Sequence, residues 1–380
     1  MKIAILGNIP LPIGLDTPAG TEVFTAYLIK GLKEKGHDVT LYATNNSYIS
    51  KIKGYFTEED IRNQQQLLSD PQFQKLLYSY QNLLIKDVIV DSSRFDIIHN
   101  NYYLTSLVFP FASLFKSPVV HTVHNDLFEL SPFASFADLT LTKNDTLVYV
   151  SSNAQKKSQV KKINNVYIHN AIDHTQFAFN ADGGESMVWF SRISPNKGLR
   201  ETVMATNRLK KPLLILMNTV ETRYEDYFEK EVKTRSQDNE IIQFIQKFDN
   251  KTKIKLLGQS KLFLFPLQWE EPFGLVLLES MATGTPVVTF ARGATSEIVK
   301  DGETGYLVNP SDRDARGNWI TKKTGLEGII DAVNHIYSMP PKEYKSMRLA
   351  CKKHVEMNFS LAKMSQNYEN LYRQIINKHA

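Results

Sequence analysis

The chain has 380 residues, which is more than one hydrophobic core usually holds and therefore favours two domains. Hydrophobic residues make up 42% and charged residues 22%, as in an ordinary globular protein, and the net charge of +5 is small for this length. The nearly neutral first half of the chain and the absence of a basic stripe argue against a nucleic-acid-binding protein. The single cysteine, Cys351, excludes an intrachain disulfide, fits a reducing compartment and is interpreted as a packing residue.

Membrane and targeting signals are weak in this sequence. No run of about 18 apolar residues occurs, so we expect no membrane-spanning helix, and the apolar N-terminal run is too short for a signal peptide. We therefore expect a soluble, cytoplasmic protein. Residues 341–380 hold 8 Lys and Arg against 3 Asp and Glu, which indicates a basic helical tail with a solvated face. Peripheral contact of this tail with an anionic surface, such as a membrane, is the alternative.

The first half of the chain alternates between short apolar runs and helical patterns. Residues 2–7 are apolar, and after a loop rich in proline and glycine, Phe24, Leu28 and Leu32 recur at helical spacing. A strand at residues 38–42 completes a right-handed βαβ unit of a parallel sheet. Further elements are strands at 97–99, 119–122, 146–150 and 166–169, and an inserted pair of helices within residues 50–90.

The periodicity lapses at residues 179–184, which we interpret as a linker. The alternation then restarts, with strands at 187–190, 213–217, 262–266, 286–290 and 305–308 and a helix at about 198–209. We therefore predict an α/β protein with two doubly wound domains, residues 1–178 and 179–359, and with the last helix, about 360–380, packing back onto the first domain. Ligands bind such sheets at the carboxyl ends of the strands.

Residues 269–280, WEEPFGLVLLES, combine acidic side chains with the expected start of a helix. Pro272 suits the first helical position. A helix that starts there leaves the backbone N–H groups of Phe273, Gly274 and Leu275 without helical partners, and such an end binds anions. The segment is therefore predicted to bind a negatively charged ligand.

Two glutamates flank this predicted anion site. Glu271 and Glu279 are eight positions apart, which separates their backbones by roughly 12 Å at about 1.5 Å per helical residue. The paired carboxylates of glycoside hydrolases lie only roughly 5–9.5 Å apart across one bond. The spacing therefore suits two contacts at opposite ends of an extended ligand, with a diphosphate between them.

Two further loops carry polar side chains after predicted strands. Arg192 and Lys197, in SRISPNKG, suit a diphosphate, because arginine forms a bidentate fork and lysine supplies a point charge. Taken alone this signal is weak, because a loop with one arginine and one lysine is usually just solvated. His124, in HTVHND, can hydrogen-bond a sugar hydroxyl or polarise a leaving group. A metal site formed with His121 lacks cysteine partners nearby.

The glycine-bearing loop PAGTE, residues 18–22, follows the first strand. It lacks the G-x-G-x-x-G spacing, so we reject a dinucleotide fingerprint. Gly20 then marks either a ligand contact or a tight turn that leads into a helix. The sequence Asp312-Arg313-Asp314 is superficially similar to a metal-binding D-x-D motif, but it lies in a polar loop and we interpret it as solvated.

Together these segments resemble the family-4 retaining glycosyltransferases of the GT-B fold. EPFGLVLLES followed by MATGTPVV is the specific motif, and the similarity covers nearly the whole chain. Supporting segments are SRISPNKG, PAGTE, HTVHND, HNAID at 169–173 and EIVKDGETGYLV at 297–308. The resemblance implies two Rossmann-like domains that face each other across a deep cleft, with the acceptor bound by the first and the nucleotide sugar by the second.

The resemblance also implies the reaction. A hexose is transferred from a nucleotide diphosphate sugar, by default UDP-glucose or a related UDP-hexose, with retention of configuration and without a metal or other cofactor. Arg192, Lys197 and the three amides hold the diphosphate and stabilise the leaving group, a form of electrostatic preorganisation. The resemblance further implies that Glu279 binds the nucleotide ribose and that Glu271 binds hydroxyls of the donor sugar. It also implies that Gly20 approaches the phosphates and that His124 contacts the transferred sugar.

Some positions depart from the family pattern, and some questions stay open. Ala19 precedes Gly20, Asn170-Ala171 stands where Asn-Gly is common, and Asn218-Thr219 replaces a glycine pair. The acceptor is a sugar, a glycan, a lipid-linked molecule or a small molecule, and the aromatic stretch 102–115 either lines its site or belongs to the core. The alternative functions are a sugar phosphorylase or synthase of the same fold, and a catalytically retired member that binds sugar.

Overall fold

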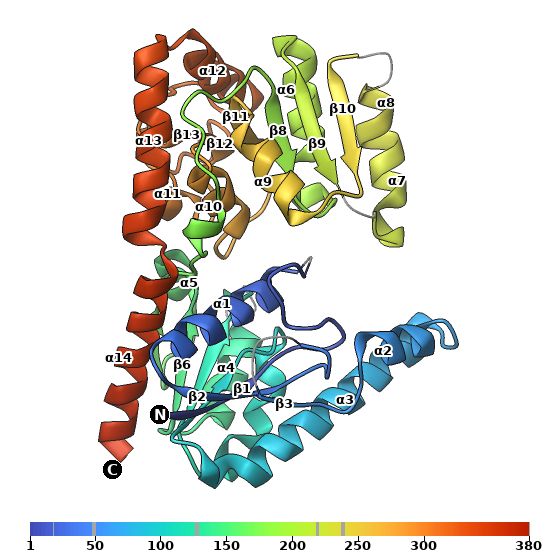
Figure 1. Ribbon diagram of the computed structural model, residues 1–380, viewed down its shortest axis with the longest axis vertical. Coiled ribbons are helices and arrows are strands. Elements are labelled where there is room, and N and C mark those ends of the chain that lie inside the picture. The colour runs from blue at the N-terminus through green and yellow to red at the C-terminus, as the bar shows by residue number, and fades with distance from the viewer. Residues whose placement is uncertain (18, 48–50, 126–128, 218–219, 237–239, 380) are drawn as a thin grey trace. The chain divides into compact units, whose positions relative to one another are not determined.

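The computed structural model describes residues 1–17, 19–47, 51–125, 129–217, 220–236 and 240–379. Pro18, Asp126, Asn218 and Thr219, which belong to segments named above, lie outside these ranges. The chain forms two compact units, one of Met1–Ala171 with Leu361–Ala380 and the other of Ile172–Ser360 (Figure 1). Each unit is built around its own parallel sheet.

The first unit contains a parallel sheet of seven strands among the described residues, in the order β3-β2-β1-β4-β5-β6-β7. Strands β5 and β6 are buried at every position and hence on both faces, as expected where helices cover both sides of a parallel sheet. The strands are β1 (Lys2–Leu6), β2 (Asp38–Tyr42), β3 (Lys51–Lys53), β4 (Ile97–Asn100), β5 (Val119–Val123), β6 (Asp145–Tyr149) and β7 (Asn164–Tyr167).

The helices of the first unit include the predicted inserted pair. Thr57 and Asp60 cap the first of these helices, because the Asp60 amide donates to Thr57 Oγ1 at 3.2 Å and the Thr57 amide donates to Asp60 Oδ2 at 2.9 Å. The helices are α1 (Gly20–Glu34), α2 (Glu58–Gln65), α3 (Asp70–Asp91), α4 (Ser131–Thr140), α5 (Ser152–Lys157) and α14 (Leu361–His379). The short strand β3 before α2 was not predicted, because three residues carry too little periodicity.

The last helix, α14, packs against α1 and the sheet of the first unit. The hydroxyl of Tyr372 lies 2.5 Å from His99 Nδ1, and that of Tyr368 lies 3.2 Å from Thr122 Oγ1. All four side chains are fully buried. A polar cluster in the interior therefore fixes the position of α14.

The second unit contains a parallel sheet of six strands in its described part, in the order β10-β9-β8-β11-β12-β13. Both sheets thus start with the strand order 3-2-1-4, which is that of Rossmann-like domains, and the order reverses between β1 and β4 and between β8 and β11. The strands are β8 (Met187–Phe190), β9 (Leu213–Met217), β10 (Ile242–Gln246), β11 (Leu262–Phe265), β12 (Val287–Phe290) and β13 (Gly305–Val308).

Helices connect the strands of the second unit. They are α6 (Leu199–Leu209), α7 (Glu225–Tyr227), α8 (Thr234–Ser236), α9 (Asn250–Gly258), α10 (Leu275–Ala282), α11 (Thr295–Ile298), α12 (Gly325–Ser338) and α13 (Pro341–Asn358). A π-helical turn, Phe228–Lys233, joins α7 to α8. The predicted strands of both halves form with ends shifted by at most two residues, whereas β10 was missed.

The segment 179–184 is not the linker that the sequence suggested. The chain enters the second unit at Ile172, and the Asn180 amide donates to Thr283 O at 3.1 Å, which ties the segment to the body of that unit. Cys351 is fully buried, and burial raises the pKa of its thiol to about 12. Its interpretation as a packing residue is confirmed.

The basic tail is only partly a solvated helix face. Arg348 of α13 is fully buried and donates to the backbone oxygens of Asn180 at 2.7 Å, Ser260 at 2.9 Å and Gly258 at 2.8 Å. A guanidinium carries five donors, so one side chain satisfies carbonyl groups at the end of α9 and on a neighbouring segment. Lys345 does lie at the surface, 2.7 Å from Asp182.

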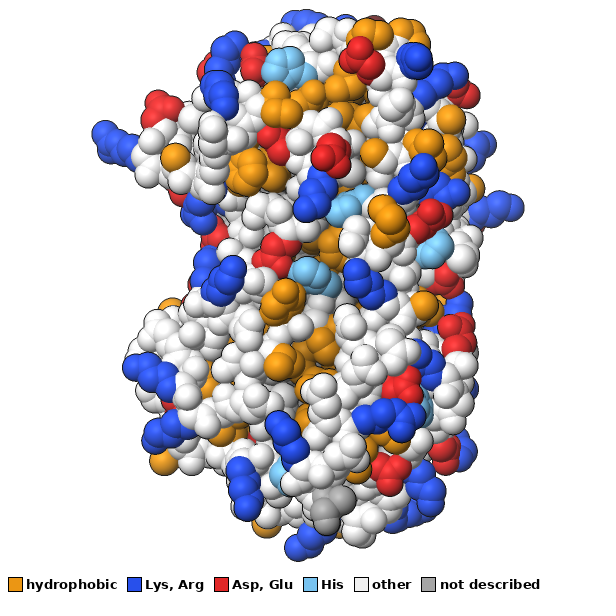
Figure 2. Space-filling view, turned by 90° about the vertical axis from the view of Figure 1, so that its left-hand side faces the viewer, with side chains coloured by type: hydrophobic (Ala, Val, Ile, Leu, Met, Phe, Trp, Pro, Cys, Tyr) orange, Lys and Arg blue, Asp and Glu red, His pale blue; other side chains and the backbone are white. Residues whose placement is uncertain are grey.

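Charges of both signs are interspersed on the face shown in Figure 2. This distribution agrees with the small net charge of the chain. Among the helices in the described ranges, none has an apolar stretch that would span a bilayer.

Candidate active site

Most of the predicted site residues lie at the carboxyl ends of β8 and β11, where the strand order of the second sheet reverses. The loop after β8 carries Arg192 and Lys197, and the loop after β11 carries Glu271. Ligands of doubly wound sheets bind at this kind of position. The fold therefore places the residues where a ligand of the second unit is expected.

Lys197 and Glu271 form an ion pair beside an indole ring. Lys197 Nζ lies 2.5 Å from Glu271 Oε2 and 4.8 Å from the centre of the Trp269 ring. The Trp269 indole N–H donates to the same Oε2 at 2.9 Å. Both charged side chains are nearly buried, at 11% and 12% exposure, so their attraction is only weakly screened. Sequence reasoning identified the two charges, but not the indole donor.

The backbone around Lys197 is held by the strands on either side. The Trp189 indole N–H donates to Lys197 O at 3.2 Å, and the Gln268 amide donates to Asn196 O at 2.9 Å. Gly198 has φ +70, and a Cβ at this position would lie 2.0 Å from Pro266 O. Only glycine satisfies both conditions, so Gly198 fixes how the Lys197 loop leaves the sheet.

The loop after β12 supports the backbone of Glu271. The Ala294 amide donates to Glu271 O at 2.9 Å, and a Cβ on Gly293 would lie 2.2 Å from the same oxygen. The Gly293 amide donates to Glu270 Oε2 at 2.8 Å. Glu270 also pairs with Arg316 at 3.0 Å. Glu270 thus joins the two loops, while the Glu271 side chain points to Lys197.

Asp314 also differs from its predicted solvated state. Its carboxylate accepts from Arg316 and lies 3.5 Å from Arg292, and the hydrogen bond from Arg316 holds its pKa below the ordinary value. Arg292 in turn lies 3.5 Å from Glu270. Asp314 is therefore part of an ion network beside the site, whereas Asp312 and Arg313 are exposed as expected.

Helix α10 begins later than the sequence suggested. Its first residue is Leu275, and Gly274, with φ +105, occupies the N-cap position, so Pro272 is not the first helical residue. The positive φ of Gly274 breaks the helix at that point, which the preference of proline for helix starts does not reveal. Among the described residues, the amides of Gly274, Leu275 and Val276 meet no acceptor, so two of the three predicted amides, those of Gly274 and Leu275, remain available to an anion together with that of Val276.

The Phe273 side chain is 3% exposed and packs 5.9 Å from the ring of Phe359. It therefore belongs to the core of the second unit. The amide of Phe273 precedes the N-cap residue Gly274 and therefore lies outside the first turn of the helix.

Glu279 lies on α10, 9% exposed, and a second lysine holds it. Lys253 of α9 places its Nζ 2.9 Å from Glu279 Oε2 and 5.0 Å from the centre of the Phe190 ring. Sequence reasoning missed Lys253. Asp249 caps α9, since its side chain accepts from the Thr252 amide at 2.7 Å, and this cap marks the start of the helix in the sequence. The pairing of Lys253 with Glu279, by contrast, is a tertiary contact that the sequence does not mark.

Arg192 is not brought to the other site residues in this structure. Its side chain is 66% exposed, and Nη1 lies 3.6 Å from Glu221 Oε1. Glu221 also pairs with Arg223 at 2.6 Å. The structure thus groups Lys197, Glu271 and their supporting residues, and leaves Arg192 at the surface of the same loop.

In the first unit, His124 follows β5 and is oriented by an asparagine. His124 Nε2 lies 3.0 Å from Asn101 Oδ1, and Asn101 Nδ2 donates to Thr25 Oγ1 at 3.1 Å. This network assigns the proton to Nε2 and leaves Nδ1 as an acceptor. The ring meets the edge of Phe24 at 4.8 Å, and burial lowers the pKa of His124 to about 3, so the imidazole is neutral at pH 7.

A metal site at the two histidines does not fit the contacts. Both ring nitrogens of His121 are engaged, Nε2 with Asp145 Oδ1 at 2.9 Å and Nδ1 with Asn100 Nδ2 at 3.0 Å. In the part of the chain that is described, no group of three or more His, Cys, Asp or Glu side chains is arranged to hold a metal ion.

Gly20 is the first residue of α1, after the N-cap residue Ala19. In the first turn, Glu22 is 6% exposed and accepts from Asn8 Nδ2 at 3.1 Å. The Asn8 amide oxygen in turn accepts from the Tyr103 amide at 2.7 Å. The helix start therefore lies beside the loops that follow β1 and β4.

The aromatic stretch 102–115 belongs mainly to the core. Tyr102, Phe109 and Phe115 are 2%, 0% and 7% exposed, whereas Tyr103 is 40% exposed. The core interpretation therefore holds for these three rings, whereas Tyr103, Leu107 and Leu114 are exposed.

Family profiles match both halves of the chain. The profile described as "Glycosyltransferase Family 4" matches residues 18–176, and the one described as "Glycosyl transferases group 1" matches residues 171–323. Together the two matched ranges run from residue 18 to residue 323.

Solved structures share the fold over almost the whole chain. Sucrose-phosphate synthase from Thermosynechococcus elongatus superimposes with a TM-score of 0.72 at 18% identity, over 99% of both chains. HepE from Anabaena, in complex with UDP and glucose, gives 0.71 at 16% identity, over 98% of this chain and 100% of that one. At these identities the likeness concerns the fold alone, which is the GT-B fold.

Curated relatives match over parts of their length. Spore coat protein SA from Bacillus subtilis is 24% identical over 35% of this chain and 32% of that protein, and a glycogen synthase from Mycobacterium tuberculosis is 26% identical over 48% and 42%. The chain thus spans less than half the length of these two relatives. A phosphatidyl-myo-inositol mannosyltransferase from Mycolicibacterium smegmatis is 23% identical over 80% of each.

Two Rossmann-like units with polar side chains at the carboxyl ends of their strands define a protein of the GT-B class. With both profiles in agreement, the chain belongs to the family-4 glycosyltransferases of this fold. The family resemblance read from the sequence motifs is confirmed.

Proposed function

We propose that this protein is a retaining glycosyltransferase that moves a hexose from a nucleotide diphosphate sugar to an acceptor hydroxyl. The observation that carries the proposal is the arrangement around α10. Lys197 and Glu271 lie at the switch point of the sheet, Glu279 lies within the helix, and the amides of Leu275 and Val276 have no acceptor among the described residues. A cation, an anion-binding helix end and a second carboxylate together suit the parts of a nucleotide sugar.

The donor contacts follow from the chemistry of each group. The amides of Leu275 and Val276 and the ammonium of Lys197 bind the diphosphate, because both carry positive charge. Glu279 accepts hydrogen bonds from the ribose hydroxyls, and Glu271 accepts them from the donor sugar. Arg192, exposed on the same loop, turns from Glu221 to add a guanidinium to the phosphates.

We assign UDP-glucose or a related UDP-hexose as the donor. The support is the similarity of fold to HepE, whose structure holds UDP and glucose. We assign the second unit to the donor and the first to the acceptor, which is a sugar, a glycan, a lipid-linked molecule or a small molecule. In the first unit, Gly20 approaches the phosphates and the free Nδ1 of His124 accepts a hydroxyl of the transferred sugar.

The chemical step needs stabilisation of the leaving diphosphate. Lys197, Arg192 and the helix amides supply fixed positive charge where negative charge develops, which is the role a metal ion plays in other enzymes, so we propose a metal-independent reaction. The acceptor hydroxyl attacks the face that the diphosphate leaves, and the leaving phosphate oxygen takes its proton. Retention follows because bond breaking and bond formation share one face of the sugar.

We also propose a cytoplasmic location, with which the thiol of Cys351 is consistent.

Binding and turnover test the proposal separately. We expect UDP-sugars, in preference to GDP- or ADP-sugars, to raise the melting temperature of the protein, and mass spectrometry of acceptor libraries to show a mass increase of one hexose. Lys197→Met is expected to lower transfer by about 100-fold, the effect of removing one stabilising group from the transition state. Lys255→Met, an exposed lysine on α9, is the matched control.

The outcomes also separate the alternative functions. Sugar phosphate formed from inorganic phosphate without a nucleotide would identify a phosphorylase. Sugar binding without turnover of any donor would identify a retired member. If no nucleotide sugar binds, or if Lys197→Met transfers hexose at the wild-type rate, the proposed function is wrong.

A further inference from the structure

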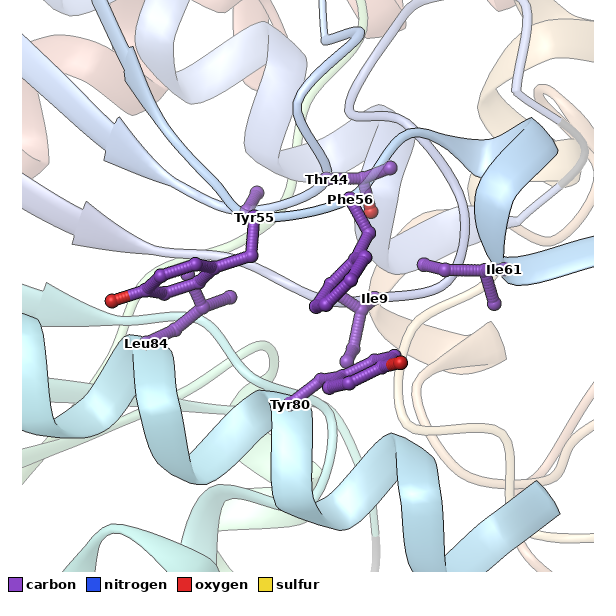
Figure 3. Close-up of a pocket in the computed structure, with 8 residues that line it drawn as sticks. Ile9, Thr44, Tyr55, Phe56, Ile61, Tyr80 and Leu84 are labelled. Carbon is purple, nitrogen blue, oxygen red and sulfur yellow. The ribbon is translucent and has the colours of Figure 1, made fainter. Parts of the chain in front are cut away.

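The inserted helices close a small pocket over the carboxyl ends of β1 and β2 in the first unit. Figure 3 shows that aromatic side chains of this insertion line the pocket, together with residues that follow the two strands. The cavity has a volume of about 10 Å³. It is lined by Ile9, Ala43, Thr44, Tyr55, Phe56, Ile61, Tyr80 and Leu84. The lining is apolar except for three hydroxyl groups.

The insertion is fastened to the end of β2, so the pocket is a built feature. The Asn45 amide donates to Phe56 O at 2.8 Å, and a Cβ on Gly54 would lie 2.2 Å from Ala43 O. The rings of Phe56 and Tyr80 stack with centres 3.9 Å apart. Backbone bonds and ring stacking together hold the wall of the pocket in place.

One polar atom in the pocket lacks a partner. Thr44 is 1% exposed, and its hydroxyl has no hydrogen-bond partner among the described residues. The other two hydroxyls are engaged, since Tyr55 donates to Asp87 Oδ2 at 2.6 Å and Tyr80 donates to Gln64 Oε1 at 2.8 Å. A buried hydroxyl without a partner is costly, which points to a ligand that supplies the missing bond.

Size and polarity together limit that ligand. A cavity of about 10 Å³ accommodates one water-sized group. A water molecule needs two to four polar partners, and Thr44 Oγ1 is the one hydroxyl of the described lining that has none, since both tyrosine hydroxyls already donate elsewhere. A methyl group fills the same space among apolar walls, and an adjacent carbonyl oxygen accepts the hydrogen bond of Thr44. An acetamido group has both parts, and only its methyl group needs to enter the cavity.

The position of the pocket connects it with the acceptor. The pocket and His124 both lie at the carboxyl ends of strands of the first sheet. The pocket follows β1 and β2, His124 follows β5, and the strands between them run in the order β2-β1-β4-β5. Three strand spacings separate them, which is about 14 Å. We propose that the pocket formed by Thr44, Phe56 and Tyr80 is an acceptor subsite that binds the acetamido group of an N-acetylated sugar. This inference rests on the proposed glycosyltransferase function.

Methyl NMR on the full-length protein tests the subsite directly, because Ile9, Ile61 and Leu84 line it. We expect N-acetylglucosamine to shift the methyl signals of these three residues, and glucose at equal concentration to leave them unchanged. Equal shifts with both sugars, or shifts with neither, overturn the inference. If the sugar causes no shift and a long-lived water molecule is detected beside Thr44, the inference is overturned as well.

Variants of Thr44 separate binding from folding. Thr44→Val keeps the shape but removes the hydroxyl, so we expect about fivefold weaker binding of N-acetylglucosamine, the effect of one hydrogen bond, together with a raised melting temperature. Thr44→Ser keeps the hydroxyl and is expected to retain binding. Thr140→Val is the matched control, since the Thr140 hydroxyl donates to Phe136 O at 2.6 Å on α4. Unchanged sugar affinity of Thr44→Val would refute the subsite.

A UDP titration of the same samples keeps the two proposals apart. If UDP binds and N-acetylglucosamine does not, the acceptor subsite is wrong and the transferase function stands. If N-acetylglucosamine binds and no nucleotide or nucleotide sugar does, the subsite stands as a sugar site and the transferase function is wrong.

Discussion

Each of the two glutamates of the α10 motif is held by a lysine from another segment. Lys197 pairs with Glu271 at 2.5 Å and Lys253 with Glu279 at 2.9 Å, and all four side chains are 11–12% exposed. Charges buried to this extent need partners, because desolvation is costly. We infer that the donor exchanges its own hydroxyls and phosphates for these contacts when it binds.

The Lys253–Glu279 pair gives the first prediction. Lys253→Met removes the partner of a nearly buried carboxylate, so we expect the free energy of unfolding to fall by about 2–3 kcal/mol, below the range for fully buried pairs. UDP affinity is expected to fall as well, because Glu279 loses its orientation. Thermal denaturation and calorimetric titration measure the two effects, with the exposed Lys255→Met as control. Equal stability of both variants would contradict the pairing.

His124 gives a prediction about pH. Its folded pKa of about 3 lies below the ordinary value of 6.5, so between pH 6.5 and 3 the unfolded state binds more protons. Stability therefore falls as the pH is lowered through this window, by up to about 1.4 kcal/mol per pH unit. Between pH 6.5 and 5 the unfolding free energy of wild type is expected to fall by about 2 kcal/mol more than that of His124→Asn. Urea denaturation at both pH values measures this difference.

An independent measurement checks the protonation state itself. The ring signals of His124, assigned by their loss in His124→Asn, should not titrate between pH 8 and 5. A titration midpoint near pH 6.5 would contradict the neutral, buried imidazole.

At the scale of single residues, the sequence predicted charges better than contacts. Glu271, Glu279 and Lys197 were found because a local motif carries them. Lys253 was missed, because its role depends on the packing of α9 beside α10, which no local pattern shows. Arg192 was found with the motif, but its position against Glu221 also required the structure.

At the scale of elements, glycines set the geometry of the loops that carry the site. Gly198 combines φ +70 with an approach to Pro266 O that leaves no room for a Cβ. Gly36 has a similar φ of +80, but nothing lies within 4 Å of its Cβ position. A side chain at Gly36 would therefore cost only the strain of the left-handed backbone, whereas a side chain at Gly198 would cost this strain and a steric clash.

This pair gives the third prediction. Gly36→Ala is expected to cost about 1–2 kcal/mol of stability, the penalty for a left-handed backbone with a side chain, and to leave UDP binding unchanged. Gly198→Ala is expected to cost more, because the Cβ also displaces the Lys197 loop from Pro266, and to weaken UDP binding. Chemical denaturation and calorimetric titration of both variants give the comparison. Equal effects on UDP binding would show that Gly198 does not position the site.

Element boundaries show where sequence patterns reach their limit. The buried strands were predicted closely, because continuous apolar runs between loops mark them clearly. Strands β3 and β10 at the ends of the two sheets were missed, since both are partly exposed and neither has the continuous apolar run that marks the buried strands. The start of α10 was misplaced because the left-handed Gly274, not Pro272, sets it.

At the scale of the whole molecule, alternation of strands and helices was enough to predict two doubly wound units. The strand orders and the exact point where the chain passes from one unit to the other were not evident, because both depend on pairing between distant segments. The return of the chain to the first unit through α14 was predicted, whereas the contacts that hold the helix there were not. It depends on His99 and Thr122, which lie far from α14 in the sequence.

The buried contacts of α14 give the last prediction. Tyr372→Phe leaves His99 Nδ1 without its partner at 2.5 Å, so we expect the first unit to lose about 1–3 kcal/mol, the cost of an unsatisfied buried polar group. Calorimetry should show a lower melting temperature, while UDP affinity, which we assign to the second unit, is expected to stay unchanged. Arg373→Met, next to it on the exposed face, is the control and should shift stability by less than about 0.5 kcal/mol. Wild-type stability of Tyr372→Phe would show that the hydrogen bond to His99 does not hold α14 in place.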